Sequence, residues 1–323
     1  MLRITTRLFL SVLVSSILLF PAQAAEAQLV KVKGVQPEVG VQFLPAYVAQ
    51  AKGIFKDEGL EVELITVRGA KEGVQALVGG DVHFIMTIGP VLPAIWQGID
   101  LKLLAQMVGM PTFSLIVRPE INKIEDLKGK KIGVSFGGMT LTLLHDLLKL
   151  NGLDPEKAVE YVNIPGSPPK IAALEKGVIA AALLSSPGDF EAIRVGFKRL
   201  VFLGDLMPDL PLIGLIVAAR YMKENPKIVE KLVRAIVRAV YATRDDSETA
   251  ISVMQSYLKM KPDEARDTYF LIRKSFSPVL TEAGLKRVAE MVSKSAGIRP
   301  TKEPKEYMDL GFLNQAVVEL GRR

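Results

Sequence analysis

The sequence predicts an α/β fold whose sheets are mainly parallel. Short apolar runs alternate with segments in which apolar residues recur every three or four positions, which is the pattern of strands separated by helices. From about Lys223 to the end, the pattern becomes nearly all helical. The chain of 323 residues is long enough to build two lobes, each with its own core.

The elements follow from the apolar periodicity and the turn residues between the runs. Strands are predicted at 29–35, 62–67, 83–87, 101–108, 114–118, 131–135, 160–164, 180–184, 198–203 and 212–218. Helices are predicted at 47–53, 70–79, 89–97, 139–151, 168–175, 188–196 and 226–243. Further helices begin at Pro262 and Glu282, after Lys261 and Thr281.

The N-terminus has the pattern of a secretory signal peptide. Arg3 and Arg7 precede an apolar run at 8–20, and Ala22-Gln23-Ala24 follows it. The run is shorter than the roughly 20 residues that a membrane-spanning helix needs. We therefore predict a signal peptide over 1–24, with cleavage after Ala24 and a periplasmic, soluble mature protein.

The composition excludes several classes of function. The chain has no cysteine, so it has neither disulfides nor a lipid-attachment cysteine. The net charge is +6 and basic residues are interspersed with acidic ones, without the basic runs and interleaved aromatics of a nucleic-acid-binding protein. With two scattered histidines and no cysteine, a transition-metal site is not expected either.

Residues 41–64 carry the most specific pattern of the chain. A loop with Phe43, Leu44, Pro45 and Tyr47 leads into a short helix that Gly59 ends, before an alternating strand begins. The phrase Ala-x-x-Lys-Gly-Ile-Phe-x-x-Glu-Gly-Leu-x-Val, over 49–62, resembles the opening of solute-binding proteins of the nitrate/sulfonate/taurine type, which serve ABC importers. That family also resembles the binders and synthases of the thiamine pyrimidine precursor.

The resemblance implies a type II periplasmic-binding fold, with two α/β lobes, a hinge and a central cleft. Lobe one would contain 25–118 and 212–323, with the C-terminal helices, and lobe two would contain 119–211. The implied function is capture of a small organic anion by lobe closure, with aromatic and sulfonated compounds as the candidates. We expect a monomer without cofactor that delivers its solute to a membrane ABC permease and binds no nucleic acid. The alternative is an enzyme on the same fold, such as a pyrimidine-precursor synthase or a dehydratase.

Residues 133–137 read Gly-Val-Ser-Phe-Gly between a strand and a helix, which matches the nucleophile elbow of hydrolases. The chemistry needs a histidine base, and His145 lies inside the helix that the elbow would begin. We favour an anion-binding loop in which amide groups at the helix start and nearby hydroxyls hold a carboxylate, sulfonate or nitrate. The alternative is an ordinary helix start. The candidate residues are Ser135, Phe136, Gly137, Gly138, Met139 and Thr140.

Other polar candidates follow strands at the same predicted edge. Thr87 follows one strand, where it either bonds a ligand or caps a helix, and Ser185 and Ser186 follow another. Arg68 follows the second strand and could pair with an anion.

Apolar candidates would suit an aromatic ligand body. Phe43, Leu44, Tyr47 and Phe136 are proposed to line the cleft, and Phe113 either lines it or packs in the core.

Two motifs are set aside. Ser167-Pro168-Pro169-Lys170 spells the Ser-x-x-Lys of acyl-transferring enzymes, but its two prolines argue against the helix that the motif needs. His83 is interpreted as a structural histidine rather than a ligand or a catalytic residue.

Overall fold

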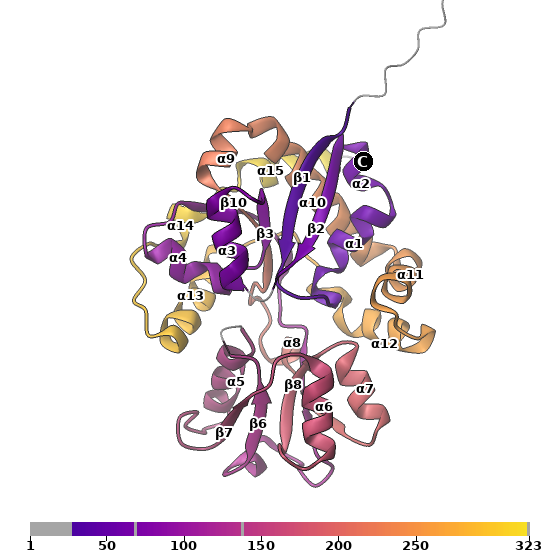
Figure 1. The fold of residues 1–323 in the computed structure, drawn as a ribbon, viewed down its shortest axis with the longest axis vertical. Helices are drawn as coiled ribbons and strands as arrows, with labels where there is room; N and C mark the ends of the chain where they lie inside the picture. The colour runs from indigo at the N-terminus through magenta and orange to yellow at the C-terminus, as the bar shows by residue number, and fades with distance from the viewer. Residues whose placement is uncertain (1–27, 68–69, 137–138, 322–323) are drawn as a thin grey trace, which may run out of the picture.

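The computed structural model describes residues 28–67, 70–136 and 139–321. They form two lobes, each built on a five-stranded sheet. Figure 1 shows the first lobe above, with the indigo N-terminal strands and the orange and yellow C-terminal helices, and the second lobe below. The predicted signal peptide, Arg68, Gly137 and Gly138 lie outside the described residues.

The first sheet has the spatial order β2 (Leu60–Thr66), β1 (Val30–Gln36), β3 (Phe84–Met86), β10 (Ile213–Ala218) and β4 (Leu101–Val108). β1 is parallel to β2 and β3, whereas β10 is antiparallel to both of its neighbours. The inner strands β3 and β10 and the edge strand β4 are almost wholly buried, whereas the other edge strand, β2, alternates exposed positions with buried or half-buried ones along most of its length. This burial explains their continuous apolar runs and the alternating pattern of β2.

The second sheet has the order β7 (Glu160–Asn163), β6 (Lys131–Val134), β8 (Ala181–Ser185), β5 (Phe113–Val117) and β9 (Lys198–Phe202). Here β5 is the antiparallel strand. In both sheets, therefore, the antiparallel strand is the one that follows a crossing between lobes. The predicted α/β class with mainly parallel sheets is confirmed.

Helices cover both sheets. In the second lobe they are α5 (Met139–Leu150), α6 (Ser167–Glu175), α7 (Gly188–Arg194) and α8 (Leu203–Leu206). In the first lobe they are α1 (Leu44–Ala51), α2 (Ile54–Asp57), α3 (Ala70–Gly79), α4 (Leu92–Trp96), α9 (Ala219–Glu224), α10 (Pro226–Asp245), α11 (Ser247–Leu258), α12 (Pro262–Ile272), α13 (Glu282–Ala296), α14 (Pro304–Tyr307) and α15 (Gly311–Gly321). The all-helical C-terminal region is confirmed. Among the described residues, no helix combines the length and apolar character that crossing a membrane requires.

The crossing into the second lobe comes earlier than predicted. The strand expected at 114–118 was assigned to lobe one, but β5 pairs with β8 and β9 of the second sheet. The chain therefore crosses at residues 109–112, before β5 rather than after it. Pro119 ends the strand but does not mark the crossing, because a turn at either end of a buried strand gives a similar sequence pattern.

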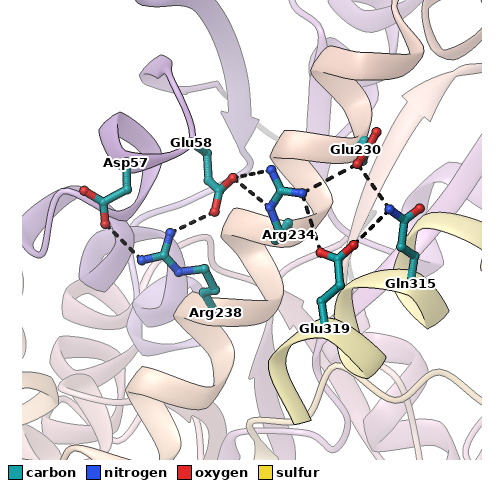
Figure 2. A network of polar contacts seen from close by, with 7 residues as sticks. All are labelled: Asp57, Glu58, Glu230, Arg234, Arg238, Gln315 and Glu319. Atoms are coloured by element: carbon teal, nitrogen blue, oxygen red, sulfur yellow. Dashed lines mark hydrogen bonds and ion pairs between the residues drawn. The ribbon is translucent and has the colours of Figure 1, made fainter. Parts of the chain in front are cut away.

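A charged network fastens the long helix α10 to its neighbours (Figure 2). Glu58, which follows α2 and is 9% exposed, accepts hydrogen bonds from Arg234 Nε and Arg238 Nη1, each at 2.8 Å. Arg238 also bonds Asp57 at 2.9 Å, and Arg234 pairs with Glu319 of α15 at 3.6 Å. The network ties together three segments that are far apart in the sequence.

We expect Glu58→Gln to lower the free energy of unfolding by about 2 kcal/mol at neutral pH, because two half-buried guanidinium groups would lose their shared carboxylate. Burial alone would raise the pKa of Glu58, but the bonds and charges of Arg234 and Arg238 outweigh it and hold that pKa below its ordinary value. The contribution is therefore present above the ordinary pKa and is lost as pH falls through the lower, folded-state pKa.

Urea unfolding at about pH 7 and at about pH 3 measures this difference. The control is Glu63→Gln, an exposed carboxylate of β2. Equal stability of the Glu58→Gln variant and the wild type at neutral pH would contradict the prediction.

Candidate functional site

A cleft of about 690 Å³ lies between the two lobes. Its walls come from the segments that follow β1, β3, β6, β7 and β8, and from the starts of the antiparallel strands β5 and β10. Since the parallel strands of each sheet end at the same edge, their following loops converge there, which is where ligands dock in open α/β sheets. The volume is in the usual range for a small-molecule site.

Most of the predicted site residues line this cleft. They are Phe43, Thr87, Phe113, Ser135, Phe136, Met139, Thr140, Ser185 and Ser186. The first two belong to the first lobe and the others to the second. Their position fits the prediction, and their contact with a ligand stays a prediction.

Leu44 and Tyr47 were wrongly placed on the cleft wall. The helix predicted at 47–53 begins at Leu44, so both side chains turn into the first core, where they are 0% and 3% exposed. The Tyr47 hydroxyl donates a hydrogen bond to Gln36 Oε1 at 2.9 Å, and its ring stacks on Tyr257. Burial raises the pKa of Tyr47 to about 12.

Lys170 lines the cleft on the second-lobe side and was not predicted as a site residue. It is 4% exposed, and its Nζ donates to Ser135 Oγ and to the Leu183 carbonyl, each at 3.2 Å. Burial lowers the pKa of Lys170 to about 8, although the charge of Glu38 raises it. The cleft therefore contains a buried amine that an anionic group would hold in its charged form.

The two prolines do not prevent the helix that carries Lys170. α6 begins at Ser167, with Pro168 and Pro169 in its first turn, where a missing amide donor costs nothing. The reason given for setting the motif aside was therefore wrong. Lys170 nevertheless bonds Ser135, 35 residues away, and no bond joins it to Ser167 among the described residues.

Glu38 and Gln42 line the cleft on the first-lobe side, and neither was predicted as a site residue from the sequence. The Gln42 side chain is 1% exposed and its Nε2 donates to Glu38 Oε1 at 2.6 Å. Gln42 Oε1 is buried and has no hydrogen-bond partner among the described residues. Desolvation by the surrounding protein raises the pKa of Glu38, and the charge of Lys170 opposes that rise. Their position just after β1 is the signal that would have found them.

The loop that carries Ser185 and Ser186 rests on a buried ion pair. Asp189, at 0% exposure, accepts hydrogen bonds from Ser114 Oγ at 2.7 Å and Arg199 Nη2 at 2.8 Å. These bonds anchor the first turn of α7 to β5 and β9, and so fix one side of the cleft.

Contacts between the lobes flank the cleft. Arg194 of α7 forms an ion pair with Glu264 of α12, and the Met139 side chain packs against Gly89. The described residues contain no group of three or more potential metal ligands. His83 accepts a hydrogen bond from the Lys33 amide at 2.9 Å and packs against Tyr221, contacts that fit the predicted structural role.

This chain is similar to known proteins of several kinds. The taurine-binding periplasmic protein of Escherichia coli K12 is 37% identical over 148 residues, which are 44% of this chain and 45% of that relative. The ligand-binding component of an ABC-type import system from Staphylococcus aureus matches with a TM-score of 0.73 and 14% identity, over 90% of this chain and 99% of that one. The desulfurization enzyme DSZB matches with a TM-score of 0.66 and 18% identity, over 90% and 99%.

The structural likenesses show a fold that binding proteins and at least one enzyme share. The predicted periplasmic-binding fold is confirmed, since its two lobes, two crossings and central cleft are all present. The sequence match is more specific than the fold, because the model of one protein family covers residues 41–250, more than half of the chain. The chain therefore belongs to the NMT1/THI5-like family.

Proposed function

We propose that this protein is the extracytoplasmic solute-binding component of an ABC importer and captures a small anionic organic solute by closing its lobes. The observation that carries the proposal is the buried amine of Lys170 in an inter-lobe cleft of about 690 Å³. A taurine-binding relative and an ABC-import neighbour support the class of function. The periplasmic location, the permease partner and the monomeric state belong to the same proposal.

The cleft walls suit an organic anion better than a bare inorganic one. Phe43, Phe113 and Phe136 surround the polar floor, and burying an apolar ligand body against such rings is favourable. A ligand that contacts both lobes also stabilises the closed form by its differential affinity for it.

A direct test is thermal unfolding of the purified protein with sulfonates, aromatic carboxylates and pyrimidines. Capture predicts a saturable rise in melting temperature with one class, and recovery of the solute unchanged after long incubation. The alternative is an enzyme on this fold, and the contact between Ser135 Oγ and Lys170 Nζ is the observation that favours it. Conversion of the bound solute would establish the enzyme and overturn the binder.

We expect Phe136→Asp to weaken solute binding by about 100-fold or more without unfolding the protein. Phe136 is 50% exposed and lines the cleft beside Ser135, so an aspartate there removes an apolar wall and repels an anion. Calorimetric titration gives the affinity, and the control is Val178→Asp, which is 51% exposed and lies outside the cleft. Unchanged affinity in the Phe136 variant would remove this loop from the site.

A further inference from the structure

The two walls of the cleft have opposite hydrogen-bonding character. On the first lobe, the Glu38 carboxylate and Gln42 Oε1 are acceptors, because Gln42 Nε2 already donates to Glu38. On the second lobe, Lys170 presents a cation beside the hydroxyl of Ser135. A single ligand that satisfies both walls must therefore carry groups of both kinds.

The first-lobe wall is built to receive a donor. The Gln42 amide is fixed, because its Nε2 bonds Glu38 Oε1 and its side chain is 1% exposed. Its Oε1 is buried without a partner among the described residues, and a buried acceptor without a donor costs about 1 to 3 kcal/mol. The Glu38 carboxylate faces the cleft next to it. An ammonium group matches a carboxylate and an amide carbonyl, because it has several donors and the opposite charge.

The second-lobe wall is built to receive an acceptor. A lysine ammonium has three donors, and two of those of Lys170 are directed at Ser135 Oγ and the Leu183 carbonyl. The third remains for a ligand, and no carboxylate among the described residues pairs directly with Lys170. A carboxylate or sulfonate group matches this wall, because both carry negative charge and accept more than one hydrogen bond.

Glu38 and Lys170 attract each other across the cleft, yet they form no direct ion pair in the part of the chain described. The rings of Phe43 and Phe113 line the cleft with them, and apolar walls strengthen the attraction of each charge for a ligand group. A molecule with its own charges at its two ends replaces the missing direct contact.

Resting on the proposed function, we propose that the anionic group of the solute is one end of a zwitterion, whose ammonium group binds Glu38 and Gln42 Oε1 and whose acid group binds Lys170 and Ser135. Each end contacts a different lobe, so the molecule bridges the lobes when they close. An anion without the amine satisfies only the second lobe and leaves the carboxylate and carbonyl of the first lobe without a donor.

One other carboxylate lines the cleft and provides a control. Glu191 of α7 lies on the second-lobe side, so it is the competing partner for a ligand ammonium. Glu38→Gln keeps the size of the side chain but removes the charge on the first-lobe wall. Glu191→Gln makes the same change on the other wall.

The test is calorimetric titration in a buffer free of sulfonates and carboxylates. The probes are aminoalkanesulfonates and aminoalkanecarboxylates of increasing length, each paired with the compound of equal length that lacks the amine. We expect the amine to raise the affinity by about 100-fold in the wild type and the Glu191→Gln variant. In the Glu38→Gln variant we expect that preference to disappear, with little change for the compounds without an amine.

Equal or tighter binding of the compounds without an amine overturns the zwitterion and leaves solute capture intact. A preference that survives in Glu38→Gln but disappears in Glu191→Gln also overturns it, because the ammonium would then lie on the second lobe. If none of the probes binds but an uncharged solute does, the zwitterion and the anionic character of the solute both fail, and only solute capture remains. If no solute of any class binds, the proposed function fails with it.

Melting temperatures of the ligand-free variants within about 2 °C of the wild type show that each is folded.

Discussion

Replacing Lys170 with methionine is expected to weaken the binding of anionic solutes by about 100-fold, while the protein remains folded. The lysine is 4% exposed, so the solute's acid group loses a charge-assisted hydrogen bond in a place that little water reaches. Methionine keeps most of the apolar stem and removes the cost of burying an ammonium group. The loss of the hydrogen bonds to Ser135 Oγ and the Leu183 carbonyl opposes that gain, so the free energy of unfolding should change by less than about 1 kcal/mol.

Calorimetric titration measures the affinity, and urea unfolding the stability. The matched control is Lys176→Met, at the exposed end of the same helix. Unchanged affinity of the Lys170→Met variant would show that the acid group of the solute binds elsewhere.

The lowered pKa of Lys170 leads us to expect opposite effects of rising pH on solute affinity and on the stability of the ligand-free protein. Burial lowers the pKa of Lys170 to about 8, against the charge of Glu38, and Glu191 is the other carboxylate of the cleft. An anionic solute binds the protonated lysine, so its affinity should fall as pH rises above about 8, by at most tenfold per pH unit. The ligand-free protein should instead become more stable between about pH 8 and pH 10, because the unfolded chain binds the extra proton there. Both trends should be absent in Lys170→Met.

The largest expected loss of stability is that of Asp189→Asn, about 3 kcal/mol. Asp189 is fully buried and accepts hydrogen bonds from Ser114 Oγ, Arg199 Nη2 and the Phe190 amide. Asparagine has nearly the same shape but no charge, so the Arg199 guanidinium, 23% exposed, loses its ionic partner. The loop before α7 should lose its anchor as well.

Urea unfolding measures this loss, with the exposed Asp205→Asn as the control. Adding Arg199→Met to the variant should recover part of the stability, because it removes the unpaired charge. A loss below about 0.5 kcal/mol would mean that Arg199 reaches solvent when its partner is gone.

Periodicity was sufficient to predict the helices, the strands and the α/β class, whereas the two-lobe fold was implied by the family resemblance. The strands and helices expected from apolar spacing are all present, most within two residues of their predicted ends, because burial on a sheet or a helix face imposes that spacing directly. The loops at strand ends were predictable for the same reason, and they supplied Ser135, Thr87 and Ser185.

What periodicity missed depends on contacts across long separations. β5 reads as a buried apolar run whichever sheet it joins, so its membership of the second lobe is not visible in the sequence. Leu44 and Tyr47 point into the core because α1 begins at Leu44 rather than at the predicted residue 47. Lys170 reaches Ser135 only after α6 packs beside β8, and a lone lysine after two prolines gives no sign of that burial.

The place of β10 affects the order in which the lobes can be completed during synthesis. Every strand of the second sheet lies between residues 113 and 202, so that lobe is continuous in the chain. The first sheet cannot be completed before β10 is synthesised. β10 lies between β3 and β4 and is translated after the whole second lobe. The lobe whose synthesis starts first is therefore the last to be completed, and until then the edges of β3 and β4 that β10 will pair are open to other strands.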